Sequence, residues 1–128
     1  MRRTRVLVAD DDPDVRDWVR TVLGQRGVVV LEAESGVELL ERLSTSGPFD
    51  LVIADVRMSW ATGVQALAMA RRAGFELPFL VITSHADEAL RGEVASLGAR
   101  LLSKPFTLAQ FLDAAGQALG RQRLSRAG

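Results

Sequence analysis

The stretch "VLVADDDPDVR" (residues 6–16) joins an apolar run to three consecutive carboxylates, a proline and the start of a helical pattern. A short apolar run that ends abruptly in turn-forming residues is typical of a buried strand. Asp12-Pro13 then has the composition of a helix N-cap followed by proline at the first helical position. The stretch therefore predicts a strand, a tight turn and a helix in close succession, which is the repeating unit of an α/β fold.

The same alternation continues along the rest of the chain. Runs such as "LVIA" and "FLVIT" are almost continuously apolar, as expected of strands that are covered by helices on both faces. The five predicted strands span residues 5–9, 28–32, 51–54, 79–83 and 100–103. We therefore expect a (βα)5, doubly wound α/β fold, with a five-stranded parallel sheet in the flavodoxin-like order 2-1-3-4-5.

Capping signals mark the predicted helix boundaries. The capping-box pattern occurs at Ser35-x-x-Glu38, Thr62-x-x-Gln65 and Thr107-x-x-Gln110. Glycines stand where helices should end, at positions 24, 27, 74 and 98. Within the first helix, Trp18 belongs to a stripe of apolar residues at helical spacing, so we expect it to lie in the core.

The composition excludes several classes of protein. The 128 residues fit one domain, and 16 basic against 16 acidic side chains argue against direct binding of nucleic acid or an anionic membrane. Without cysteine and with one histidine, a disulfide framework or a zinc cluster is not expected. No segment approaches the length of a membrane span, so a cytoplasmic protein is predicted. We assign residues 1–120 to the domain and 121–128 to a basic tail or linker stub.

Polar residues follow the carboxyl ends of the predicted strands. Asp10 and Asp11 end the first strand and Asp55 ends the third, and these two strands are neighbours in the predicted order. Three carboxylates in one place are costly without a cation, and a site with only oxygen ligands favours Mg²⁺. Thr83 and Lys104 end the fourth and fifth strands, where they can bind phosphoryl oxygens. The pattern predicts a Mg²⁺ and phosphate site at this edge.

These elements resemble those of a response-regulator receiver domain. The resemblance covers residues 5–119 and rests on "VLVADDDPDVR", "DLVIADVRMSWATG", "FLVITS" and "LLSKPF", in that order and at receiver spacing. It implies a two-component phosphoacceptor that catalyses only its own phosphorylation and dephosphorylation. The implied partners are a sensor histidine kinase or phosphotransfer protein and a downstream protein or attached effector domain. Formation of a homodimer is compatible with the resemblance.

The resemblance also implies individual roles. Asp55 is the phosphoacceptor and binds Mg²⁺ together with Asp11 and the backbone carbonyl of Arg57. Asp10 acts on the metal through water. Thr83 and Lys104 bind the phosphoryl group, and the peptide bond between Lys104 and Pro105 is expected to be cis.

The chain departs from the family pattern at two places. Met58-Ser59, followed by Trp60, stands where the family usually has Met-Pro. Leu101 replaces the aromatic switch residue, so we expect the signal to leave through the loop at residues 59–62. Arg57 and His85 are expected to border the path of attacking water.

Other interpretations of these residues differ in how well the sequence supports them. The acids at residues 10–12, taken alone, are also compatible with helix capping, but the positions of Asp55 and Lys104 disfavour that interpretation. A calcium loop is rejected because its sixth and twelfth positions are Val15 and Thr21 rather than glycine and glutamate. The rival functions are a receiver-like interaction module that works without phosphorylation and a Mg²⁺-dependent aspartyl-phosphate hydrolase. The hydrolase is disfavoured because the chain has no cap segment to enclose a substrate.

Overall fold

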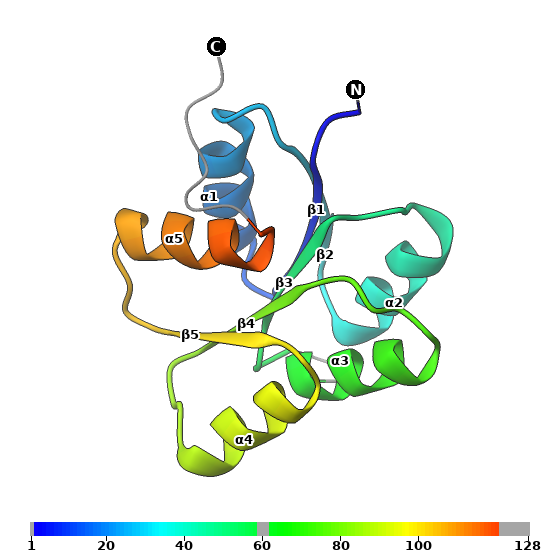
Figure 1. Cartoon of the computed structure of the whole chain (residues 1–128). Helices are drawn as coiled ribbons and strands as arrows, with labels where there is room; N and C mark the ends of the chain where they lie inside the picture. The colour runs from blue at the N-terminus through cyan, green and yellow to red at the C-terminus, as the bar shows by residue number, and fades with distance from the viewer. Residues whose placement is uncertain (1, 59–61, 121–128) are drawn as a thin grey trace.

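The computed structural model describes residues 2–58 and 62–120 of the chain. Its parallel sheet has five strands in the order β2-β1-β3-β4-β5, so the predicted fold class and strand order are confirmed (Figure 1). The strands are β1 (Arg5–Ala9), β2 (Val29–Ala33), β3 (Leu51–Asp55), β4 (Phe79–Thr83) and β5 (Arg100–Ser103). The helices are α1 (Pro13–Gly24), α2 (Gly36–Thr45), α3 (Gly63–Arg72), α4 (Glu88–Ser96) and α5 (Leu108–Ala118).

Helices cover both faces of the sheet. In Figure 1, α1 and α5 lie on one side of the strands, and α2, α3 and α4 lie on the other. Successive residues of a strand point to opposite faces, so Val6 and Val8 join the cluster under α1 and α5, while Leu7 joins the other cluster. All five residues of β3 and of β4 are buried. Each fully buried Val, Leu or Ile contributes about 1.5–3 kcal/mol.

Two strand boundaries differ from the sequence prediction. β2 begins and ends one residue later, at Val29 and Ala33, because Val29 pairs with Arg5 and Ala33 with Ala9. β3 continues through Asp55, which pairs with Ile82 of β4. Cross-strand hydrogen bonds determine where these strands begin and end, and the residue types alone do not predict those positions.

The helix starts follow the capping signals closely. Asp12 accepts the N–H of Asp14 at the start of α1, and complete capping boxes begin α3 and α5. The capping box predicted for α2 is only half formed. Ser35 accepts the N–H of Glu38 at 3.1 Å, but the Glu38 carboxylate accepts the N–H of Glu34 instead of that of Ser35. Asp87 caps α4, which the sequence analysis did not anticipate.

The prediction that Trp18 lies in the core is wrong. Its side chain is 37% exposed, because it lies at the margin of the α1 stripe and Phe111 of α5 occupies the interior position beside it. The Trp18 ring packs edge-on against Phe111 with centroids 4.9 Å apart, and its centroid lies 5.9 Å from that of Phe106. Trp18 and Phe106 instead line a surface groove of about 630 Å³ together with Lys104 and Leu108.

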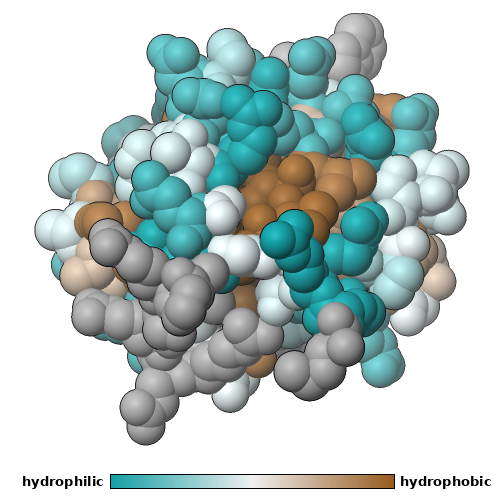
Figure 2. Space-filling model, turned by 90° about the horizontal axis from the view of Figure 1, so that it is seen from above, coloured by the Kyte–Doolittle hydropathy of each residue, from teal (hydrophilic) through white to brown (hydrophobic). Residues whose placement is uncertain are grey.

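One face of the molecule has a mainly polar surface (Figure 2). Figure 2 shows one face on which hydrophilic residues predominate around a central apolar patch. None of the helices within residues 2–58 and 62–120 combines the length and apolar character needed to cross a membrane. Trp60 and the predicted tail at residues 121–128 lie outside the described residues.

Candidate functional site

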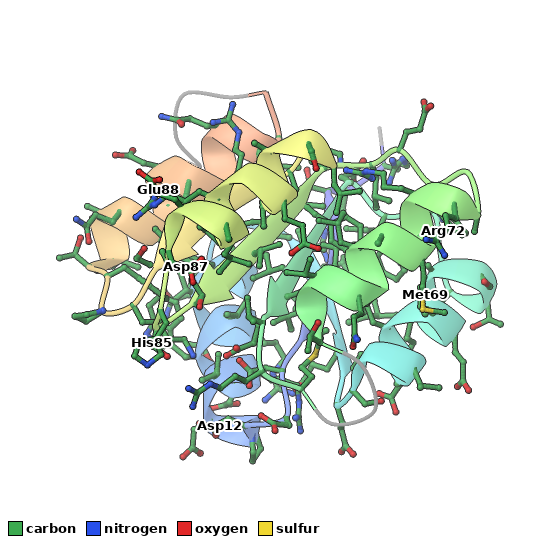
Figure 3. All side chains as sticks on the ribbon, turned by 90° about the horizontal axis from the view of Figure 1, so that it is seen from below. Asp12, Met69, Arg72, His85, Asp87 and Glu88 are labelled. Atoms are coloured by element: carbon green, nitrogen blue, oxygen red, sulfur yellow. The ribbon has the colours of Figure 1, made fainter. Side chains whose placement is uncertain are left out.

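Parallel strand ends bring the predicted site residues to one edge of the sheet. Ala9 pairs with Ala54, so the residues that follow them, Asp10 and Asp55, emerge side by side. Thr83 pairs with the last residue of β5, directly before Lys104. Figure 3 views the molecule from below and shows Asp12 and His85 at this end, on the loops after β1 and β4.

Asp55 is the most fully engaged carboxylate of the site. It is 7% exposed, and each of its oxygens accepts a hydrogen bond. Lys104 Nζ lies 2.7 Å from Oδ2, and the backbone N–H of Arg57 donates to Oδ1 at 2.8 Å. The carboxylate is thereby held in one orientation at the end of a rigid strand.

Lys104 stays cationic in this setting. Burial lowers the pKa of the Lys104 ammonium, but the hydrogen bond that it donates to Asp55 and the charges of Asp55, Asp10 and Asp12 outweigh this effect. The net effect is a pKa above the ordinary value. The site therefore holds a fixed positive charge next to the predicted acceptor.

Asp10 is buried with little compensation for its charge. It is 2% exposed, and its pKa is raised from 3.8 to about 7, first by burial and further by the neighbouring Asp55. The N–H of Asp12 opposes this shift by donating to Asp10 Oδ1 at 2.9 Å. The backbone N–H of Asp10 donates to the Ala33 carbonyl at 3.1 Å, which anchors the residue to β2. Two buried carboxylates thus face one lysine, and the excess charge is negative.

Thr83 lies across the sheet edge with its hydroxyl oxygen already used as an acceptor. It is 5% exposed, and its Oγ1 accepts the backbone N–H of His85 at 3.1 Å. The hydroxyl hydrogen is therefore directed away from that N–H and is free to donate to an anion. His85 and Arg57 are exposed, and the peptide bond between Lys104 and Pro105 is cis.

The other predicted residues lie further from this cluster. Leu101 is within β5, partly buried against the core cluster on the α2–α4 face. Asp11 follows Asp10 directly, and its side chain is exposed. Trp60 is outside the described residues.

Two residues of the site were missed by sequence reasoning. A Cβ on Gly63 would lie 2.3 Å from the backbone carbonyl oxygen of Asp55, so only glycine lets α3 begin this close to β3. Its sequence signal was a glycine directly after the Thr62 cap. Arg16 is 11% exposed and donates to the Asp10 carbonyl at 2.7 Å. Its signal was a charged residue beside the apolar stripe of α1.

The donor set fits a hard divalent cation. Among residues 2–58 and 62–120, no three His, Asp or Glu side chains are grouped tightly enough to form a ready-made metal centre. The chemistry is nevertheless suitable, because the available donors are carboxylate and carbonyl oxygens. The pKa of Asp10 is raised chiefly by burial and further by Asp55, and a nearby cation would favour its charged form. A divalent cation at this edge would supply the positive charge that one lysine does not.

Comparison with known sequences places the chain in one family. A family model described as the response regulator receiver domain matches residues 6–116. The chain is 37% identical over 123 residues to the response regulator MprA of Mycobacterium ulcerans, covering 94% of this chain and 52% of that protein. It is 38% identical over 111 residues to MprA of Mycobacterium sp. strain KMS, covering 84% and 47%. The chain thus spans about half the length of these curated relatives.

Solved structures show the same architecture. The non-phosphorylated HemR receiver domain of Leptospira biflexa superposes with a TM-score of 0.84 at 30% identity, covering 94% of this chain and 98% of that chain. The chemotaxis response regulator CheY4 of Vibrio cholerae gives 0.83 at 28%, with coverages of 91% and 99%. The response regulator TrrA of Thermotoga maritima, solved in complex with Mg²⁺-BeF, gives 0.78 at 26%, with coverages of 90% and 98%.

Proposed function

The chain belongs to the response regulator receiver domain family, and on that basis we propose that it is a phosphoacceptor of two-component signalling. Asp55 accepts the phosphoryl group from a phosphohistidine on a sensor histidine kinase or phosphotransfer protein. The observation that carries this is the 2.7 Å contact between Lys104 Nζ and Asp55 Oδ2 beside a second buried carboxylate, Asp10. In this proposal the domain comprises residues 1–120 and works in the cytoplasm.

Asp55 is the nucleophile. Its carboxylate attacks phosphorus, and the bond from phosphorus to the imidazole nitrogen of the donor breaks, with its electron pair left on that nitrogen. The backbone N–H of Arg57 donates to Asp55 Oδ1 and so orients the carboxylate. Lys104 then transfers its hydrogen bond from Asp55 Oδ2 to a phosphoryl oxygen, which leaves Oδ2 facing the phosphoryl group. The hydroxyl of Thr83 donates to a second phosphoryl oxygen.

Magnesium completes the charge balance of the site. Asp11, Asp55 and the backbone carbonyl of Arg57 would hold the ion, with Asp10 reaching it through water. When bound, Mg²⁺ neutralises the carboxylates and the phosphoryl oxygens. Two observations support this assignment: the raised pKa of Asp10 and the Mg²⁺-BeF complex of the similar TrrA.

Phosphorylation of Asp55 begins the signal by changing the charge of the site. A phosphoryl group adds about −1.5 to −2 charges next to Thr83 and Lys104. Leu101, unlike an aromatic ring, does not offer two alternative packings, so in this proposal the change reaches the output partner through residues 59–62, of which 59–61 lie outside the described residues. That partner is a downstream protein or an attached effector domain.

Intact-mass measurement with acetyl phosphate and Mg²⁺ tests the proposal. The wild type should gain one stable phosphoryl group, and Asp55→Asn should gain none. Asp12→Asn is the matched control, because Asp12 is an exposed cap residue and its replacement should still be labelled. Continuous release of phosphate without a stable label would indicate a hydrolase. Neither label nor turnover would indicate an interaction module that works without phosphorylation.

A further inference from the structure

Arg16 connects the loop after β1 to β2 from the first turn of α1. Its Nη1 donates to the backbone carbonyl of Asp10 at 2.7 Å, and its Nε donates to Glu32 Oε1 at 3.1 Å. A third contact, from Nη2 to Glu34, measures 3.7 Å. The side chain is only 11% exposed although it carries a full charge. A buried guanidinium with each nitrogen directed at a different acceptor is a structural connector rather than a solvated surface charge.

Asp10 is consequently held at three points. Its N–H donates to Ala33 of β2, its carboxylate accepts the N–H of Asp12, and its carbonyl accepts Arg16. The first two bonds orient its N–H and its side chain. The hydrogen bond from Arg16 orients the peptide that joins Asp10 to Asp11. It therefore fixes the position of the Asp11 Cα atom, from which the side chain extends.

The Glu32 carboxylate is fixed from two sides. Arg16 occupies Oε1, while Arg20, one helical turn later, donates to Oε2 at 3.3 Å. Arg20 is 55% exposed, and its second partner is Asp17. Arg20 therefore shares Glu32 with Arg16, but its hydrogen bonds go to Glu32 and Asp17 and not to Asp10. This difference makes Arg20 a matched control for Arg16.

We infer that Arg16 is a positioning residue for the Mg²⁺ ligands, acting through the Asp10 carbonyl with Glu32 as its anchor. This inference rests on the proposed function. The contacts of Arg16 are with the backbone carbonyl of Asp10 and with Glu32 and Glu34, not with the carboxylates of the proposed metal ligands. Its charge is already balanced by Glu32 and Glu34. Its role is to hold the backbone between Asp10 and Asp11 in the orientation that lets Asp11 reach the ion. Lysine cannot replace it, because one ammonium lacks the planar fork that reaches a carbonyl and a carboxylate together.

The sign of the effect separates positioning from simple charge. If Arg16 acted only as a nearby cation, its removal would strengthen Mg²⁺ binding, because repulsion between two positive charges would be lost. If it positions the ligands, its removal weakens binding. Loss of a group that orients a metal ligand typically costs about 10–100-fold in affinity.

Calorimetric titration with Mg²⁺ alone tests the inference on the full chain. We expect Arg16→Met and Arg16→Lys to weaken Mg²⁺ binding about tenfold, while Arg20→Met binds as the wild type does. Adding Glu32→Gln to Arg16→Met should cause no further loss, because the connection is already broken. Thermal unfolding without Mg²⁺ is measured in parallel to separate binding from stability.

Three results would overturn the inference. One is unchanged or tighter Mg²⁺ binding by Arg16→Met with a lowered melting temperature, which would make Arg16 purely structural. The second is wild-type affinity in Arg16→Lys, which also decides the question if the methionine variant fails to fold. The third is equal weakening in Arg20→Met. If the wild type itself neither binds Mg²⁺ nor accepts a phosphoryl group, the proposed function fails instead, before any variant is compared.

Discussion

Replacing Asp10 by asparagine should stabilise the metal-free protein at neutral and alkaline pH. Asp10 is 2% exposed, and its pKa is raised from 3.8 to about 7, chiefly by burial. The folded state therefore binds this proton more tightly than the unfolded chain does. The resulting stability is fully present below the unfolded pKa of 3.8 and is lost as the pH rises towards the folded pKa of about 7. Asparagine has nearly the same shape and carries no charge at any of these pH values.

The size of the effect follows from the same shift. A difference of about three pH units, at 1.36 kcal/mol each, corresponds to about 4 kcal/mol in the free energy of unfolding. Asp10 interacts with Asp55 and Lys104, so part of this cost belongs to the cluster and not to Asp10 alone. We expect Asp10→Asn to gain about 2–4 kcal/mol at about pH 8 and clearly less at about pH 5. This is a large share of the 5–15 kcal/mol that is typical of a folded domain.

Urea unfolding across the range from about pH 5 to pH 8, without Mg²⁺, measures the effect. The control is Asp17→Asn, which removes an exposed carboxylate paired with Arg20 and should change stability by less than about 1 kcal/mol at every pH. Adding Mg²⁺ should stabilise the wild type more than Asp10→Asn, because the ion relieves the same charge. The reasoning is refuted if the wild type and Asp10→Asn have parallel pH profiles, or if the asparagine variant is less stable at about pH 8.

Three further outcomes are expected. Gly63→Ala should lose about 1–3 kcal/mol of stability, because its Cβ would lie 2.3 Å from the backbone carbonyl that ends β3. The control Gly92→Ala, where a Cβ meets nothing within 4 Å, should gain about 0.5–1 kcal/mol in urea unfolding. Arg57→Ala should lose its phosphoryl group faster than the wild type in a time course of intact mass, because the long side chain hinders in-line water; an unchanged decay removes Arg57 from this account. In amide exchange with beryllofluoride, protection should change mainly in the loop at residues 59–62, and a response centred on Leu101 and α5 would contradict the proposed output route.

Local sequence was sufficient for the strand boundaries to within one residue and for the starts of α1, α3 and α5. Asp12 and Thr107 cap α1 and α5 as predicted, because a cap depends on hydrogen bonds within three residues of chain. The strand order also followed, since alternating strands and helices leave few arrangements for a parallel sheet. The placement of Asp10 beside Asp55 is then a consequence of topology, because parallel strands end at the same edge.

The remaining features depend on segments that are distant along the chain. Trp18 carries the apolar signature of a core residue, yet the packing of Phe111 from α5 and of Phe106, which precedes that helix, leaves it at the surface. Arg16 resembles a surface residue of α1, and its burial follows from acceptors in the loop after β1 and on β2. Helical periodicity reports which face of a helix is apolar, but not which neighbouring element covers that face or how completely.

The electrostatic character of the site has the same origin. The sequence identified Asp10 as one of three adjacent acids, whereas its pKa of about 7 arises from burial and from Asp55, which lies on another strand. The need for glycine at position 63 likewise comes from the approach of α3 to the end of β3. Desolvation and close contacts depend on which atoms surround a residue. Those atoms come from elements far apart in sequence, and they reach the residue only when the protein folds.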